Sequence, residues 1–313
     1  MTSRGVRLGT LLDTKAKLAV SEDGNASKSS NTCVACQGGL VPLGKSRDYL
    51  YCSCNNCKTI QLSPVPSQHD IERAYSDSQF AVEAHGQGDP EAIYASSRPY
   101  YANIADALTD NKISGQVVDY GAGWGGLCAL LRERGFQCRG VELAKEMVDG
   151  CKRRNLPVEQ GTLATLLRQG LTAQAVVLCG VFEHLSQPRE FLRDAHQLLD
   201  EGGVLVSLQP TAAFAALLAW MCRLGQRQRP LPPWFWVFDA PWHIALYSPE
   251  GMKLMAEQEG FDLVEIRFCP LGRVKGLYGL VQRIVEAINK LGWGISGSQW
   301  PLSVSHTFVF RKR

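Results

Sequence analysis

The chain has 313 residues, a formal net charge of +3, 45% hydrophobic residues and 20% charged residues. These figures exclude a disordered chain and are typical of a globular protein of about two domains with a buried core. The charge lies at the ends, because residues 1–30 carry +2 and Arg311–Arg313 carry +3, which leaves −2 on residues 31–310. A near-neutral body predicts no nucleic-acid partner.

Five of the eleven cysteines lie between Cys33 and Cys57. A secreted disulfide scaffold is shorter and spreads its cysteines along the chain. The N-terminal residues have no continuous apolar core of the kind that signal peptides need. The best membrane-spanning candidate, Val204–Cys222, contains Ser207 and Gln209 and fails the test of about 20 mostly apolar residues. We therefore expect a cytoplasmic protein without a transmembrane segment.

Residues 1–30 are rich in Ser, Thr, Lys and Gly and predict a mobile tail. In residues 31–64, short extended runs alternate with two Cys-x2-Cys pairs that are 17 residues apart. This spacing is typical of a zinc ribbon, in which four thiolates form a closed tetrahedron. A closed site has no place for a water ligand, so we predict a structural zinc ion. The module that it stabilises is expected to position the segments of the chain that face the substrate. The predicted ligands are Cys33, Cys36, Cys54 and Cys57, with Cys52 as the alternative third ligand.

Residues 65–112 are predicted as a helical linker or cap, with helices at His69–Tyr75 and Glu91–Leu108. From residue 113 to residue 313, short apolar runs alternate with helical segments. Strands are predicted at Gln116–Tyr120, Gln137–Leu143, Ala175–Cys179, Gly203–Leu208, Phe261–Phe268 and Val304–Arg311, and helices at Gly125–Arg134, Lys145–Arg154, Pro188–Leu199, Ser248–Glu259 and Leu277–Leu291. This alternation predicts an α/β fold with a mostly parallel, doubly wound sheet.

A glycine-rich turn, Gly121–Gly126, joins the first of these strands to the following helix. Glycine permits a tight turn and lets a ligand approach the backbone closely. Glu142, 21 positions after Gly121, ends the next strand, where its carboxylate can accept hydrogen bonds from two ribose hydroxyls. The sequence therefore predicts a nucleoside-containing cofactor at this edge of the sheet.

Two cofactors fit that loop, because its glycines also match the dinucleotide fingerprint G-x-G-x-x-G. Asp119, two residues before the first glycine, distinguishes them. A carboxylate at this position repels a pyrophosphate but suits the ammonium group of S-adenosylmethionine. S-adenosylmethionine is therefore the favoured cofactor, and an oxidoreductase is a minor alternative.

Three motifs carry a family resemblance: the loop of Asp119–Gly126, the strand and Glu-His pair of Ala175–Leu185, and the acidic Gly-Gly turn of Leu198–Leu205. With them, residues 115–311 resemble the class I S-adenosylmethionine-dependent methyltransferases. The resemblance implies a Rossmann-like, seven-stranded sheet whose last strand is antiparallel. The residues expected to bind the cofactor are Asp119, Gly121, Ala122, Gly123, Trp124, Glu142, Leu143 and Gly180.

The N-terminal module narrows this resemblance. The four-cysteine ribbon, the Pro64-x-Pro66 segment, a short helix with Tyr75 and the stretch Phe238–His243 are together similar to bacterial C-methyltransferases of nucleotide-linked keto-deoxysugars. The acceptor expected from this resemblance is a small molecule, a sugar or a sugar nucleotide. Those enzymes also have a further C-terminal domain, and a tyrosine where this chain has Val181. The alternative is therefore O-methylation of another small or lipid-linked acceptor.

Methyl transfer needs alignment, a deprotonated acceptor and exclusion of water. His184 follows the fourth strand, at the carboxyl edge where open α/β sheets bind ligands. It is the predicted general base, and its structural alternative is to cap the next helix. Glu183 is expected either to orient His184 or to reach the cofactor or the acceptor instead. His243 is a second candidate, as a base or acceptor ligand, against the alternative of a packed histidine. A non-catalytic zinc-ribbon protein with a methyltransferase fold is the alternative from another class of function.

An aromatic segment, Trp234–Phe238 with Trp242, precedes the Ser248 helix. It is interpreted either as an acceptor-binding lid or as core between domains. A third interpretation joins it to Ala213–Met221 and Leu277–Leu291 as a peripheral membrane contact that serves a lipid-linked acceptor. Because an apolar helical stripe is more often core, burial of Leu277–Leu291 is the favoured expectation.

Overall fold

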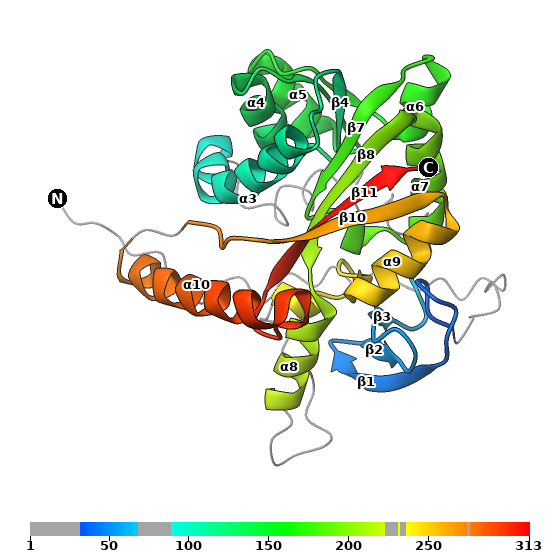
Figure 1. Cartoon of the computed structure of the whole chain (residues 1–313), viewed down its shortest axis with the longest axis vertical. Coiled ribbons are helices and arrows are strands. Elements are labelled where there is room, and N and C mark those ends of the chain that lie inside the picture. Colours follow the sequence, from blue (N-terminus) through cyan, green and yellow to red (C-terminus); the bar gives the residue numbers. More distant parts are fainter. Residues whose placement is uncertain (1–31, 68–88, 223–230, 232–235, 274–275) are drawn as a thin grey trace.

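Two β-sheets organise the computed structural model, which describes residues 32–67, 89–222, 231, 236–273 and 276–313 (Figure 1). The larger sheet has seven strands in the order β10-β11-β8-β7-β4-β5-β6. Its strands are β4 (Gln116–Tyr120), β5 (Gln137–Glu142), β6 (Val158–Gln160), β7 (Ala173–Cys179), β8 (Leu199–Pro210), β10 (Phe261–Phe268) and β11 (Ser305–Lys312). β11 runs antiparallel to both of its neighbours, whereas β4 to β8 pair in parallel. The predicted seven-stranded fold with an antiparallel last strand is confirmed.

Helices cover both faces of this sheet (Figure 1). On one side lie α3 (Pro90–Asp110), α4 (Gly126–Glu133) and α5 (Lys145–Arg153), and on the other lie α6 (Leu163–Arg168), α7 (Pro188–Leu198) and α9 (Pro249–Gln258). Successive strand residues face opposite sides, so that Val117 packs in the core under α3 and α4 while Val118 packs in the core under α6, α7 and α9. Burial on both faces explains the apolar runs Ala175–Cys179 in β7 and Val204–Val206 in β8.

The helix α3 begins where its sequence dictates. Asp89 precedes it with an extended backbone, and its carboxylate accepts hydrogen bonds from the amides of Glu91 and Ala92. Pro90 occupies the first helical position, where a missing N–H costs nothing. The predicted tail 1–30, the predicted helix His69–Tyr75 and the aromatic residues Trp234 and Phe235 lie outside the described residues.

The small sheet joins the N-terminal module to the rest of the chain. Its strands β1 (Leu40–Ser46), β2 (Tyr49–Cys54) and β3 (Ile60–Leu62) are antiparallel, and β9 (Ala245–Leu246) completes it by pairing with β3. Tyr51, Ile60 and Leu62 pack against α8 (Ala212–Cys222) in a shared core. The module is therefore built into the larger fold by both backbone pairing and side-chain packing.

The long helix α10 (Leu277–Ser296) corrects one expectation. Its apolar stripe, expected to be core, faces outward: Leu277 is 77% exposed and Ile295 is 85% exposed. The helix instead buries Glu286, Asn289 and Gly292. Close packing sets this orientation, because a Cβ on Gly292 would lie 2.0 Å from the Trp300 ring. Of the helices that the structure describes, none is both long enough and apolar enough to cross a bilayer.

Candidate functional site

Four cysteine side chains meet at the edge of the small sheet. The Sγ atoms of Cys33 and Cys57 lie 3.7 Å apart, and those of Cys36 and Cys54 lie 3.4 Å apart. All four sulfur atoms lie within 4.8 Å of one another, and this group does not include Cys52. Four converging thiols are the donor set that a structural zinc ion requires. The structure thus brings together the four residues that the sequence predicts as ligands.

A second set of contacts supports these sulfur atoms. The backbone amide of Asn56 donates to the Sγ atom of Cys54 at 3.3 Å, and the Asn56 side-chain amide donates to the Sγ atom of Cys36 at 3.9 Å. Amide donors stabilise negative charge on sulfur, which is the form that binds a metal. The donor set and its surroundings both fit a metal ion held by thiolates.

The loop after β4 is shaped by close packing on one side and open space on the other. Gly121 has a φ of +70°, and a Cβ there would lie 2.7 Å from the side chain of Val181. The amides of Gly121 and Ala122 both donate to the carbonyl oxygen of Val141, at 2.9 and 3.0 Å. At Gly123, whose φ is +53°, an added Cβ would meet no described atom within 4 Å. A ligand can therefore approach the backbone at Gly123.

Glu142, at the end of β5, holds this loop in shape. One carboxylate oxygen accepts the amide of Gly123 at 2.9 Å, and the other accepts the amides of Leu143 and Ala144 at 2.8 and 2.9 Å. The Glu142 side chain is therefore fixed between the glycine loop and the start of α5. Each carboxylate oxygen has two lone pairs, so the oxygen that accepts only the Gly123 amide keeps one acceptor position for a hydroxyl group of a ligand.

Asp119, on β4, carries a buried carboxylate whose charged form is destabilised by its surroundings. It is 2% exposed, and within the described residues its Oδ2 atom has no hydrogen-bond partner. Burial and the nearby charge of Glu142 raise the pKa of Asp119 to about 7, while a backbone hydrogen bond from Cys128 acts in the opposite direction. A buried carboxylate without a full set of partners is destabilising, and a bound cation would relieve that cost.

The remaining residues predicted to bind the cofactor surround the same sheet edge. Trp124 is 9% exposed and packs against α5, where a Cβ on Gly150 would lie 2.7 Å from its ring. Gly180 directly follows β7 with a φ of +67°, and its amide donates to the carbonyl oxygen of Leu208 at 2.8 Å. The Trp124 ring is thus seated between the glycine loop and α5.

Three polar side chains gather beyond the end of β7, on the short 3-10 helix η1 (Phe182–His184) and the loop before β9. The ring centroids of His184 and His243 lie 4.9 Å apart, and the Nε2 atom of His184 lies 4.0 Å from a carboxylate oxygen of Glu183. Burial raises the pKa of Glu183 to about 8 and lowers the pKa of His243. At neutral pH the Glu183 carboxyl is therefore mostly protonated and His243 is uncharged.

Backbone carbonyl oxygens orient both imidazoles. The Nδ1 atom of His184 lies 2.8 Å from the carbonyl oxygen of Trp242, and the Nδ1 atom of His243 lies 3.1 Å from the carbonyl oxygen of Val237. Because a carbonyl can only accept, Nδ1 is the donor in each ring. In the neutral form of each ring, Nε2 is then the basic nitrogen.

Residues of the N-terminal module hold the loop that carries His243. The Tyr51 hydroxyl donates to the carbonyl oxygen of His243 at 2.8 Å, and Ser46 donates to the carbonyl oxygen of Phe238 at 2.9 Å. Arg47 forms an ion pair with Asp239 at 3.3 Å. Sequence reasoning missed these contacts, because they join residues about 190 positions apart and leave no local pattern.

Comparisons with known proteins identify the family of this chain. A family model described as a methyltransferase domain matches residues 93–266, more than half of the chain. A search of curated proteins found no match. Among solved structures, magnesium protoporphyrin IX methyltransferase from Synechocystis PCC 6803 with bound SAH is 13% identical, with 79% of this chain and 100% of that chain covered and a TM-score of 0.50.

A structure described as a SAM-dependent methyltransferase from Archaeoglobus fulgidus is 18% identical, with 75% of this chain and 100% of that chain covered and a TM-score of 0.45. At identities this low, the similarity to these solved structures shows only a shared fold. The match of the family model is the observation that assigns the chain to its family.

Proposed function

Because this chain belongs to the methyltransferase domain family and is an S-adenosylmethionine-dependent methyltransferase, we propose that it methylates a sugar or a sugar nucleotide with His184 as the general base. The observation that carries this proposal is the cluster of Glu183, His184 and His243 beyond the end of β7. β7 is the direct neighbour of β4, which carries the cofactor loop. The methyl donor and the methyl acceptor would therefore meet at one edge of the sheet.

Three parts of the chain would hold S-adenosylmethionine: Asp119, Glu142 and the loop Gly121–Trp124. The fit rests on the unpartnered carboxylate oxygen of Asp119 and the open approach at Gly123. Asp119 suits the ammonium group, and the remaining acceptor position of Glu142 suits a ribose hydroxyl. When bound, this cofactor supplies an electrophilic methyl group on a sulfonium sulfur.

His184 is proposed to take the proton of the acceptor. Its Nδ1 donates to the carbonyl oxygen of Trp242, so the lone pair of its Nε2 accepts the proton. The resulting imidazolium lies beside Glu183, at 4.0 Å, and favours the ionised form of that carboxyl group. The acceptor's proton leaves the site when the imidazolium of His184, whose side chain is 17% exposed, releases it to water.

A zinc ion held by Cys33, Cys36, Cys54 and Cys57 is proposed to be structural. The module that those thiols close supplies Ser46, Arg47 and Tyr51 to the loop of His243. Zinc would therefore act on catalysis indirectly, by keeping His243 and the carbonyl partner of His184 in place.

The choice of acceptor rests on the resemblance to sugar C-methyltransferases, which includes the stretch Phe238–His243. This stretch lies close to the proposed base, because the amide of Ile244, the next residue, donates to the carbonyl oxygen of Glu183 in η1 at 2.8 Å. O-methylation of another small or lipid-linked acceptor is the second candidate. It would use the same base, because a hydroxyl group also loses a proton on methylation.

Calorimetric titration tests the cofactor site. The full chain should bind S-adenosylmethionine in preference to NADH, and the variant Asp119→Asn should bind it tenfold or more weakly, since it loses an ion pair in a buried site. Glu146→Gln, which changes an exposed acid on α5, is the matched control and should bind normally. Preference for NADH would contradict the assignment and indicate an oxidoreductase.

Mass spectrometry tests the acceptor. The chain is incubated with S-adenosylmethionine carrying a deuterated methyl group and with a set of nucleotide-linked keto-sugars. A product heavier by one labelled methyl group, with the label on a sugar carbon, is expected. Label on a sugar oxygen would favour O-methylation, and transfer only to acceptors without a sugar would contradict the proposed substrate class.

The affinity for S-adenosylmethionine should depend on pH through Asp119. Its pKa of about 7 in the cofactor-free protein means that the carboxyl is increasingly protonated below pH 7. The ammonium group binds the ionised form, so affinity should fall by tenfold or more between pH 7 and pH 5. Titrations at several pH values measure this slope. The Asp119→Asn variant should show no such slope, and a flat profile for the unaltered chain would contradict the role given to Asp119.

A further inference from the structure

The helix α10 has its amphipathic character reversed relative to an ordinary surface helix. Its buried positions include Glu286 and Asn289, whose side chains form polar contacts: Glu286 pairs with Arg273 and Lys290, each at 3.1 Å, and Asn289 accepts the indole N–H of Trp300 at 3.0 Å. The opposite face is apolar and points to solvent. Packing inside this chain therefore satisfies the polar face of α10 and leaves its apolar face uncovered by the described residues.

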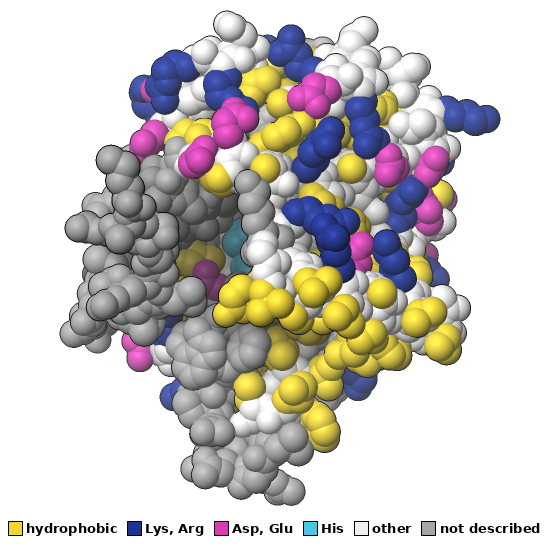
Figure 2. All heavy atoms as spheres, turned by 90° about the vertical axis from the view of Figure 1, so that its left-hand side faces the viewer, with side chains coloured by type: hydrophobic (Ala, Val, Ile, Leu, Met, Phe, Trp, Pro, Cys, Tyr) yellow, Lys and Arg dark blue, Asp and Glu magenta, His cyan; other side chains and the backbone are white. Residues whose placement is uncertain are grey.

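The outward face is large and continuous. Nine of its side chains are at least 41% exposed, and they are Leu277, Tyr278, Leu280, Val281, Ile284, Val285, Ile288, Leu291 and Ile295. Figure 2 shows hydrophobic side chains gathered in a band on this side of the molecule. On α8, Trp220 and Met221 are also exposed, at 61% and 52%. Exposed apolar surface on this scale marks a site that contacts another molecule or a membrane.

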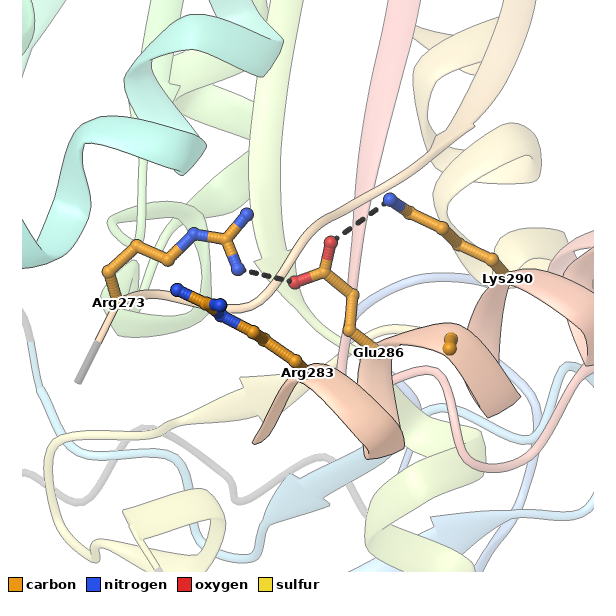
Figure 3. Close-up of a pocket in the computed structure, with 5 residues that line it drawn as sticks. Arg273, Arg283, Glu286 and Lys290 are labelled. Atoms are coloured by element: carbon orange, nitrogen blue, oxygen red, sulfur yellow. Dashed lines mark hydrogen bonds and ion pairs between the residues drawn. The ribbon is translucent and has the colours of Figure 1, made fainter. Parts of the chain in front are cut away.

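Basic side chains border the apolar face of α10. Arg273, Arg283 and Lys290 line a cleft of about 410 Å³ beside the helix, together with Glu286 and Ala287. Figure 3 shows the three cationic side chains directed to the same region, with Glu286 between Arg273 and Lys290. Three cations and one carboxylate leave this border with a net charge of +2.

We propose that α10 docks the enzyme on the surface of a membrane that contains anionic lipids. Its apolar face would lie among the upper acyl chains, and a lipid phosphate would sit in the cleft of Arg273, Arg283 and Lys290. Both features are those of interfacial helices, which combine an apolar face with Lys and Arg at its border. Anionic headgroups complement this border, whereas a second copy would bring another border of the same charge to the interface.

The position of α10 in the fold supports this docking. β10 and β8 both lie antiparallel to β11, so β10 runs parallel to β8 and ends at the same edge of the sheet as β4 and β7. The chain passes from the end of β10 at Phe268 towards α10. On this path the backbone amide of Arg273 donates to the carbonyl oxygen of Ser96, a residue of α3, at 2.8 Å. Docking through α10 would thus bring the carboxyl edge of the sheet near the lipid headgroups.

Vesicle co-sedimentation of the full chain tests the proposal. Vesicles of phosphatidylcholine with 30% phosphatidylglycerol should pellet the chain, and pure phosphatidylcholine vesicles should pellet much less. The variant Ile284→Gln/Ile288→Gln should weaken binding tenfold or more. Arg283→Glu should weaken it about fivefold or more, because each basic residue near an anionic surface contributes a factor of this size. Val41→Gln on β1 and Arg168→Glu on α6 are matched exposed controls and should bind normally.

All substituted positions are exposed, so unchanged melting curves and unchanged titrations with S-adenosylmethionine verify that each variant is folded. Failure of the unaltered chain to pellet with anionic vesicles would overturn the proposal. So would sedimentation analysis showing a dimer that the α10 variants convert to monomer without any vesicle binding, since a second copy would then cover this face. Vesicle binding is measured without cofactor or acceptor, so its failure leaves the test of methyl transfer unaffected.

Discussion

Replacing Cys57 with serine is expected to release zinc and to lower the melting temperature by roughly 10 °C or more, because structural zinc in small modules contributes on the order of 10 kcal/mol. The effect should extend beyond the module. Cys33 and Cys57 belong to the same buried cluster as Phe182, Tyr247 and Met252, which lie under the large sheet. The Ser248 hydroxyl donates to the carbonyl oxygen of Cys57 and also caps α9.

Calorimetry and metal analysis measure this outcome. Each chain should contain one zinc ion, which the Cys57→Ser variant should lose. Cys52→Ser is a close control, because Cys52 is also a buried cysteine of the module but lies outside the group of four thiols. It should keep its zinc and nearly all of its stability. A Cys57→Ser variant that retains a full zinc content and an unchanged melting temperature would contradict the proposed ligand set.

The sequence predicted the central strands β4, β7 and β8 of the large sheet well because they are buried on both faces. β4 and β10 match their predicted bounds: β4 contains a short buried run, whereas apolar and polar residues are interspersed along β10. β6, with three residues, and α6, with six, are too short to show a period, and neither was predicted as a defined segment. Short elements of this kind depend on the neighbours that they pack against rather than on their own pattern.

In the candidate site, too, features with a local sequence signal were predicted and long-range contacts were not. The Cys-x2-Cys spacing, Asp119 and Glu142 are local signals. The four thiols lie within 4.8 Å of one another and Glu142 contacts the glycine loop, while the binding roles of these residues stay predictions. The pairing of Ile60 in β3 with Leu246 in β9 has no local signal, because β9 has only two residues and lies far along the chain. The same holds for α10, whose apolar stripe was expected to be core. Periodicity identifies two faces of a helix, but the contacts of Trp300 decide which one is buried.

Replacing His184 with asparagine is expected to lower the rate of methyl transfer by about 10²- to 10⁴-fold, the usual contribution of a positioned general base. Binding of S-adenosylmethionine should stay within a few-fold of normal. The asparagine amide can still donate to the carbonyl oxygen of Trp242, so the variant keeps a hydrogen-bonding side chain while losing the basic nitrogen. Single-turnover transfer of a labelled methyl group, with the acceptor found by mass spectrometry, measures the rate.

Two controls separate catalysis from packing. His196→Asn alters a histidine that packs on Phe261, away from η1, and should leave the rate nearly unchanged. The double variant His184→Asn/His243→Asn tests whether the two imidazoles act together, because their rings lie 4.9 Å apart. If they form one proton-transfer unit, the double variant should lose little more than the single one. A normal rate for His184→Asn with a large loss for His243→Asn would move the base to His243 and leave His184 a packing role.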